Sequence, residues 1–200
     1  MGDNGTVANR LPLGTFVVVS GPPASGKTTL ARAIAPALGL PLIAKDTIKQ
    51  ALMTVLPVQD VAASRVVGAA SVAALLAVAA ETPGAVLESV WHRSRALEGL
   101  RRLPGEIVEV FCRCDPQVAA QRYALRAGSR DAGHFDSDRA IEELWNEEVA
   151  QPVAGGWPVI EVDTGNPVDV EPVIEAIRTA ARAARTGQAS AGNQRRTSPA

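Results

Sequence analysis

Short apolar runs alternate along the chain with longer segments rich in helix-forming residues. The apolar runs are rich in aliphatic side chains and have the length of strands buried on both faces of a parallel sheet. They cover residues 15–20, 41–44, 85–88, 106–112 and 158–162. Helices are predicted between and after them, over residues 28–38, 46–56, 61–81, 94–103, 115–126, 138–150 and 168–185. The pattern predicts an α/β fold with a five-stranded parallel sheet between two layers of helices.

The composition changes along the chain in a way that predicts one domain with two polar ends. Residues 1–13 are polar and contain several glycines, and we expect a flexible leader there. Residues 186–200 consist mainly of Gly, Ser, Gln, Arg and Pro, which predicts a disordered tail. Residues 14–185 between them are enough for a single domain with a full core.

The overall composition narrows the classes of partner. A net charge of −1 and an aromatic content of 4% argue against a nucleic-acid-binding surface. The most apolar stretch, residues 66–80, is rich in alanine and too short to span a bilayer, and no signal segment is evident. Cys112 and Cys114 would lie on one strand face, where they are poorly placed for a disulfide, so we expect buried free thiols. These features predict a cytoplasmic protein.

A glycine-rich loop follows the first predicted strand and carries the clearest chemical signal. Its sequence, Gly-Pro-Pro-Ala-Ser-Gly-Lys-Thr over residues 21–28, fits the phosphate-binding pattern GxxxxGK[ST] and leads into a helix. Backbone N–H groups of such a loop and of the following helix cradle phosphates. We therefore predict that the chain binds ATP with Mg²⁺. The expected nucleotide contacts are Gly21, Pro22, Pro23, Ala24, Ser25, Gly26, Lys27, Thr28 and Thr29, with the Thr28 hydroxyl as a magnesium ligand.

Asp46 follows the second predicted strand. Since parallel strands place their carboxyl ends at one edge of the sheet, Asp46 should face the phosphate loop. It could be the N-cap of the next helix, or it could take the proton from a substrate hydroxyl that attacks the γ-phosphate. We favour the general base, with Lys49 one helical turn later holding an anionic group or orienting Asp46.

Glu88 closes the third predicted strand at the same edge. It could hold Mg²⁺ indirectly, bind substrate, or be an ordinary exposed acid at a strand end. His92, Arg93 and Arg95 come next and would line the same crevice or begin the following helix. His92 could equally be a surface residue. We expect Glu88, His92 and Arg93 among the substrate-binding residues, and Trp91 in the core.

Three arginines are spaced four residues apart near the predicted polar loop 128–137. Arg122 and Arg126 share a helix face, and Arg130 enters the loop. They could form a lid that brings guanidinium groups to the phosphates and excludes water during transfer. A solvent-exposed, arginine-rich helix is the alternative.

These motifs together resemble the small P-loop kinases of the zeta-toxin, chloramphenicol-phosphotransferase, gluconate-kinase and polynucleotide-5′-kinase group, often described as AAA-type ATPases. The resemblance rests on residues 17–31, on Lys45-Asp46-x-x-Lys49 and on Arg122-x-x-x-Arg126. It implies a nucleoside-kinase-like fold with a lid, ATP as donor, and an aspartate after the second strand that activates the acceptor. It also implies that the loop after the fifth strand, with Thr164 and Gly165, touches adenine.

The resemblance leaves the acceptor open. We expect a kinase that phosphorylates a hydroxyl of a small molecule such as a sugar, nucleoside or antibiotic, with Lys27, Asp46 and Arg126 as catalytic residues. An ATPase or regulatory nucleotide-binding module is the second hypothesis, and a polynucleotide 5′-hydroxyl kinase the third. The long alanine-rich helix predicted over 61–81 lies where these folds bind the acceptor, which favours an acceptor pocket with apolar surface. Nothing in the sequence indicates the oligomeric state.

Overall fold

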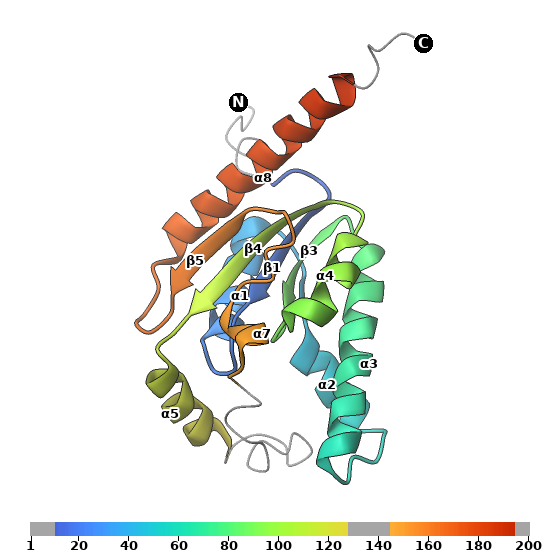
Figure 1. Cartoon of the computed structure of the whole chain (residues 1–200), viewed down its shortest axis with the longest axis vertical. Helices are drawn as coiled ribbons and strands as arrows, with labels where there is room; N and C mark the ends of the chain where they lie inside the picture. The colour runs from blue at the N-terminus through green and yellow to red at the C-terminus, as the bar shows by residue number, and fades with distance from the viewer. Residues whose placement is uncertain (1–10, 128–144, 195–200) are drawn as a thin grey trace, which may run out of the picture.

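A five-stranded parallel sheet forms the centre of the protein in the computed structural model, which describes residues 11–127 and 145–194 (Figure 1). The strands follow the order β2-β3-β1-β4-β5, and all neighbouring pairs are parallel. Their bounds are β1 (Thr15–Ser20), β2 (Leu42–Ala44), β3 (Gly84–Glu88), β4 (Glu106–Arg113) and β5 (Val159–Asp163). The predicted α/β fold is confirmed, with each strand within one or two residues of its expected position.

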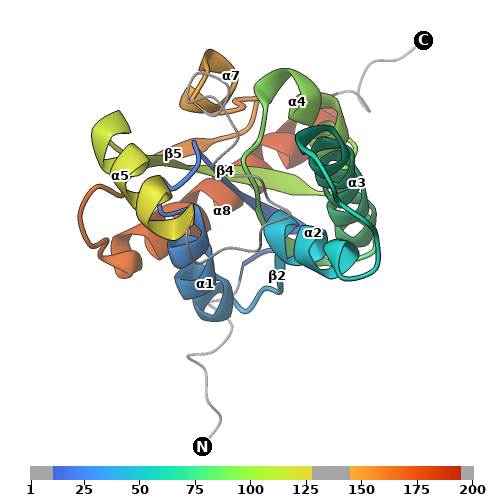
Figure 2. The same cartoon turned by 90° about the horizontal axis from the view of Figure 1, so that it is seen from below.

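Two layers of helices cover the sheet because the strand side chains alternate between two apolar cores. Val17 and Val19 of β1 pack with residues of α1 (Lys27–Leu38) and α8 (Val170–Gln194) on one face. Phe16 and Val18 pack on the other face with residues of α3 (Val61–Ala80) and α4 (Arg93–Arg101). Figure 2 shows α1 on one side of the sheet and α3 and α4 side by side on the other. The remaining described helices are α2 (Lys45–Met53), α5 (Pro116–Ala127) and α7 (Glu147–Ala150).

Two helix boundaries differ from those predicted. Ala44 is the N-cap of α2, so Asp46 lies inside the first turn of that helix. The predicted N-cap role of Asp46 is therefore wrong, because the chain turns into the helix directly at the end of β2. At the other end of the chain, α8 continues to Gln194, beyond the predicted boundary at residue 185 and into the predicted tail. No proline interrupts residues 186–194, and their alanines and glutamines are compatible with a helix. Of the helix predicted over 138–150, residues 138–144 lie outside the described part.

Helix α3 connects β2 and α2 to β3 and is apolar around much of its circumference. By length and composition it could cross a membrane, contrary to the prediction that this stretch is too short. In the fold, its side chains Ser64, Val67, Ser71, Leu75 and Ala79 are buried. The N-cap of the helix is Asp60, whose side chain accepts a hydrogen bond from the Ala63 N–H at 2.7 Å. It is thus a crossover helix of the α/β domain.

A fully buried glutamate in the middle of β4 attaches a long connection to the sheet. Glu109 accepts hydrogen bonds from Ser20 Oγ (2.6 Å), Val153 N (2.7 Å), Ala154 N (2.9 Å) and Trp157 Nε1 (2.9 Å). These four donors satisfy a carboxylate that has no access to water. The network fixes the segment that precedes β5 to the sheet.

Candidate active site

A large cavity lies at the edge of the sheet where the carboxyl ends of the strands meet. Its volume is about 1620 Å³, and its walls come from the phosphate loop, α2, α3, the start of α4, α5 and the segment after β5. Pockets that hold one drug-sized ligand are usually about 300–1,000 Å³. The cavity therefore has room for a nucleotide together with a second substrate.

The phosphate loop at the floor of this cavity depends on its glycines. Gly21 has φ +134°, and a Cβ there would lie 2.6 Å from the Cys112 carbonyl oxygen. Gly26 has φ +86°, which glycine adopts without strain, and it is the N-cap of α1. Ala24 also has a positive φ of 58°, an uncommon conformation for a residue with a side chain. The loop thus takes the tight conformation that brings its backbone to the helix start.

Lys27 opens α1 and is buried against the loop. Its ammonium group donates a hydrogen bond to the Pro22 carbonyl oxygen at 2.6 Å. Thr28 and Thr29 follow in the first turn of α1, where backbone N–H groups have no partner within the helix. All three residues line the cavity, together with Pro23, Ala24 and Gly26 of the loop. The amide groups, the helix end and the lysine make a positively polarised floor suited to phosphates.

Glu88, at the end of β3, joins this floor. It is only 5% exposed, and burial raises the pKa of its carboxyl group. Lys27 nearby and a hydrogen bond from the Thr28 side chain lower that pKa, while the negative charge of Asp46 raises it. These interactions show that the strand ends carrying the loop, Asp46 and Glu88 meet, as the parallel topology predicted. The alternative of an exposed acid at a strand end is wrong for Glu88.

Asp46 and Lys49 project from α2 at the side of the floor. Asp46 is about half exposed, and its Oδ1 lies 3.1 Å from Lys45 Nζ. Lys49 is 2% exposed and donates a hydrogen bond from Nζ to Ser64 Oγ of α3 at 2.6 Å. The carboxylate is therefore open to the cavity, and the lysine is fixed by a serine that the sequence did not single out. Only the packing of α2 on α3 could identify Ser64.

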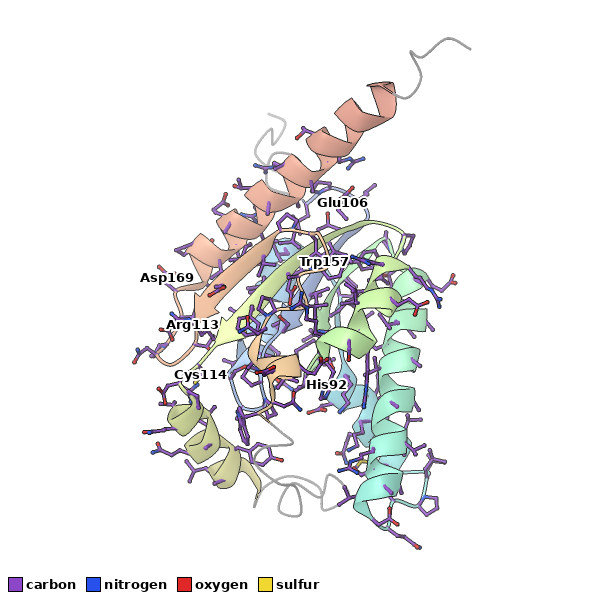
Figure 3. All side chains as sticks on the ribbon, viewed as in Figure 1. His92, Glu106, Arg113, Cys114, Trp157 and Asp169 are labelled. Atoms are coloured by element: carbon purple, nitrogen blue, oxygen red, sulfur yellow. The ribbon has the colours of Figure 1, made fainter. Side chains whose placement is uncertain are left out.

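The start of α4 carries three residues that were predicted to line the crevice. His92 and Arg95 line the cavity, and Arg93 is not among the lining residues. Both arginines are exposed, and Arg93 lies close enough to Glu148, at the cavity rim, to lower the pKa of that acid. Substrate binding by Arg93 stays a prediction. Figure 3 shows His92 at the start of α4, near α7.

Helix α7 is attached to α4 by a carboxylate. Glu148 Oε2 accepts a hydrogen bond from the Ser94 N–H at 2.7 Å. Hydrogen bonds from Ser94 backbone and side chain lower the pKa of Glu148, with smaller contributions from His92 and Arg93. The acid therefore favours its charged form at the cavity rim. Trp91, just before α4, is 2% exposed and packs in the core, as predicted.

Arg122 binds the loop after β5. Its guanidinium group donates to the carbonyl oxygens of Thr164 (2.9 Å) and Gly165 (2.8 Å). Thr164 Oγ1 in turn lies 2.5 Å from the Ser25 carbonyl oxygen of the phosphate loop. Arg122 thus stabilises the loop that is predicted to bind the base, and since it also lines the cavity, its contact with phosphates stays a prediction. The Arg126 side chain and the whole of Arg130 lie outside the described part of the chain.

Two further predictions concern the cavity walls and the thiols. Cys112 and Cys114 are free and buried, as expected, and burial raises the pKa of Cys112 to about 12. Along α3, the small and apolar residues predicted to border an acceptor site do line the cavity. They are Gly68, Ala69, Val72, Ala73 and Leu76.

Comparison with known proteins agrees with this geometry. The sequence profile of the AAA_33 family, described as "AAA domain", matches residues 16–152. A protein from Chloroflexus aurantiacus described as a "putative kinase" is similar in structure, with 28% identity and a TM-score of 0.74 over 83% of this chain and 97% of its own. No curated protein matches the chain.

Two more distant structures share the fold. A gluconokinase from Sinorhizobium meliloti has 22% identity and a TM-score of 0.55, covering 90% of this chain and 98% of its own. A shikimate kinase from Bacteroides thetaiotaomicron has 17% identity and a TM-score of 0.54, covering 82% and 97%. Since the family profile covers more than half of the chain and includes the phosphate loop and both strand-end acids, the chain belongs to the AAA_33 family, and its fold is that of the P-loop kinases.

Proposed function

We propose that the protein is a small-molecule kinase that transfers the γ-phosphate of ATP to a hydroxyl group of its acceptor. The observation that carries the proposal is the meeting of Lys27, Thr28, Glu88 and Asp46 in one cavity with room for two substrates. The similarity to the Chloroflexus protein and to the folds of a gluconokinase and a shikimate kinase supports it. We expect the enzyme to act in the cytoplasm, without a nucleic-acid or membrane partner.

The residues at the floor fit a magnesium ion that is shared with ATP. Mg²⁺ in kinases is held by one or two protein oxygens together with substrate phosphates and water. The hydrogen bond between Thr28 and Glu88 places a hydroxyl and a carboxylate next to the phosphate loop, which is such a donor set. Among the described residues, no group of three or more His, Cys, Asp and Glu side chains could hold a metal by itself. Bound Mg²⁺ would neutralise negative charge on the phosphates.

Different groups of the protein would bind the phosphates and activate the acceptor during phosphate transfer. The loop amides and Lys27 hold the phosphates and counter the charge that spreads over them in the transition state. Asp46, which is accessible from the cavity, accepts the proton of the acceptor hydroxyl as its oxygen attacks the γ-phosphorus. Lys45 Nζ lies 3.1 Å from Asp46 Oδ1 and places a positive charge beside the proposed base.

A screen for acceptor-dependent ADP release tests the proposal. Purified protein with ATP and Mg²⁺ is incubated with sugars, sugar acids, nucleosides and hydroxylated antibiotics, and the phosphorylated product is identified by mass spectrometry. Lys27→Ala should bind ATP at least ~10²-fold more weakly, since it removes a buried ammonium from the phosphates. Asp46→Asn should retain ATP binding but lose ~10²–10⁴-fold in transfer rate.

The results separate the competing functions. ADP release at the same rate with and without every acceptor would indicate an ATPase, and the kinase proposal would be wrong. A matched control is Asp60→Asn, since Asp60 caps α3 away from the cavity walls and its substitution should leave transfer unchanged. Normal transfer by Asp46→Asn would remove the general-base role but leave the kinase activity in place.

A further inference from the structure

Helix α3 carries an apolar outer face that is exposed in the described part of the chain. Arg65 is its one charged residue, and only 22% of its most apolar 18-residue stretch is buried. A helix that is apolar on all sides is normally buried within a protein. Figures 1 and 2 show α3 along the outer edge of the molecule, beside α2 and α4. Packing within the described fold therefore does not account for the composition of this helix.

The exposed apolar residues of α3 form one continuous face. They recur at intervals of three and four residues, which places them on the same side of a helix. Val66, 70% exposed, is the largest of them, and the turn before α3 adds the exposed Val55 and Leu56. Arg65 lines the cavity, at the border of this face. The members of the outer face are Ala62, Val66, Ala70, Ala73, Ala77 and Ala80.

The segments outside the described residues match this face poorly. Residues 1–10 and 195–200 are mainly polar or charged, and seven of the 17 residues of 128–144 are charged. Burying a charged group against an apolar surface is unfavourable. A membrane surface is also a poor match, because helices that lie on membranes combine basic residues on one face with Trp, Phe or Leu on the other. The matching chemistry is an uncharged helix face, and α3 of a second copy provides one of the same length.

We propose that the outer faces of α3 from two copies of this chain pack against each other in antiparallel orientation, so that the protein self-associates as a dimer. In a two-fold symmetric contact each copy contributes the same patch, and an uncharged face then meets an uncharged face. Antiparallel packing also brings the end with Arg65 to the end with Glu81 and opposes the two helix dipoles. The face extends from residue 62 to residue 80, so Ala70 near its midpoint lies close to the two-fold axis.

The dimensions of α3 predict a weak dimer. Its 20 residues make a helix about 30 Å long, and a face roughly 10 Å wide gives a footprint of roughly 300 Å² per copy. Stable interfaces bury about 800 Å² per partner, so we expect a dissociation constant of roughly 10–100 µM. Ala69 and Ala73 also line the cavity, and the helix of the second copy would therefore lie at the cavity rim.

Sedimentation velocity of the full chain without nucleotide tests this inference. Between about 1 and 200 µM protein, the mean mass should rise from that of one chain towards that of two. A wild type that stays monomeric over this range would overturn the inference. Flotation of wild type with neutral phosphatidylcholine vesicles would also overturn it, because that binding would assign the face to a membrane surface.

Charge substitutions at Ala70 decide whether α3 is the contact. Ala70→Glu and Ala70→Lys should each weaken self-association at least ~10-fold, because two like charges meet near the axis. An equimolar mixture of the two variants should regain a dimer of at least wild-type affinity, since opposite charges then face each other. Ala183→Glu is the matched control, because Ala183 is an exposed alanine of α8, on the other face of the sheet. Circular dichroism confirms that each variant is folded.

Equal dissociation constants of Ala70→Glu and Ala183→Glu, or no recovery in the mixture, would overturn the inference. The dimer is independent of the proposed kinase function, so Lys27→Ala should self-associate like wild type. A monomeric protein that phosphorylates an acceptor would refute the dimer and leave the kinase in place. A dimer without ADP release from any acceptor would leave the contact through α3 in place and refute the kinase.

Discussion

Two buried glutamates lie on either side of β1 and have opposite surroundings. Glu88 of β3 is paired in register with Val19, and Glu109 of β4 is paired with the preceding residue, Val18. Because successive positions of a strand face opposite sides of a sheet, the two carboxylates point to different layers. Glu88 faces the phosphate loop and borders the cavity, and Glu109 accepts four hydrogen bonds in the interior.

The difference shows how to distinguish a structural acid from a functional one. Glu109 has its acceptor positions filled by protein donors, so it holds two parts of the chain together. Glu88 is almost as buried, but it shares its surroundings with another acid, Asp46, and opens on a cavity. A buried acid with raised pKa in a cleft is a candidate for ligand binding. Burial alone would not separate the two.

The largest expected effect concerns the stability provided by Glu109. Glu109→Ala leaves four donors without a partner, and we expect it to reduce the free energy of unfolding by ~3–5 kcal/mol. Urea denaturation followed by circular dichroism measures the loss. Glu106→Ala, at the first position of the same strand and half-buried, is the control (Figure 3). A loss within ~1 kcal/mol of that control would contradict the structural role of Glu109.

In contrast to Glu109→Ala, Glu88→Gln should affect ligand binding more than stability. The folded state should persist, because the substitution removes a charge whose burial is unfavourable. The Mg²⁺-dependent part of ATP affinity should fall by ~10–100-fold, as for other residues that support a metal site. Calorimetric titration with ATP in Mg²⁺ and in EDTA measures this part. Unchanged Mg²⁺ dependence would show that Glu88 serves the acceptor instead.

The stability of the ligand-free protein should depend on pH through Glu88. A raised pKa in the folded state means that the folded protein holds this proton more tightly than the unfolded chain. Above the ordinary pKa of 4.5, the wild type should therefore lose stability relative to Glu88→Gln as pH rises, until it passes the folded-state pKa. Urea midpoints of both proteins from pH 4 upward measure the difference. A wild type that gains stability relative to Glu88→Gln as pH rises would contradict the raised pKa of Glu88.

The smallest effects come from the hydroxyl donors of the two glutamates. Ser20→Ala removes one of four donors to Glu109 and should reduce the free energy of unfolding by ~1 kcal/mol, with ATP affinity unchanged. Thr28→Ala removes the donor to Glu88 and should weaken Mg²⁺-dependent ATP binding with little loss of stability. A loss of ATP affinity in Ser20→Ala together with a loss of stability in Thr28→Ala would contradict the roles assigned to the two glutamates.

Most of the fold and of the expected nucleotide site could be predicted from local sequence patterns. The apolar runs predicted the strands, and the glycine-rich loop predicted a phosphate site with Lys27 and Thr28. The rule that parallel strands end at one edge of the sheet predicted that Glu88 and Asp46 lie at the same edge. One expectation failed because of local geometry: Asp46 is not the N-cap, since α2 begins at Lys45.

The sequence by itself determined which elements form and where phosphates are expected to bind, since strand length, apolar pattern and the glycine loop are local properties of the chain. The tertiary structure decided which side chains meet across the sheet. In the sequence, Glu88 and Glu109 are both acids in apolar strands. Only the packing shows that Glu109 accepts hydrogen bonds from protein donors and that Glu88 borders a cavity. Likewise, only the packed structure shows that Arg95 of α4 lines the cavity, because this depends on how the helices pack and not on residue type.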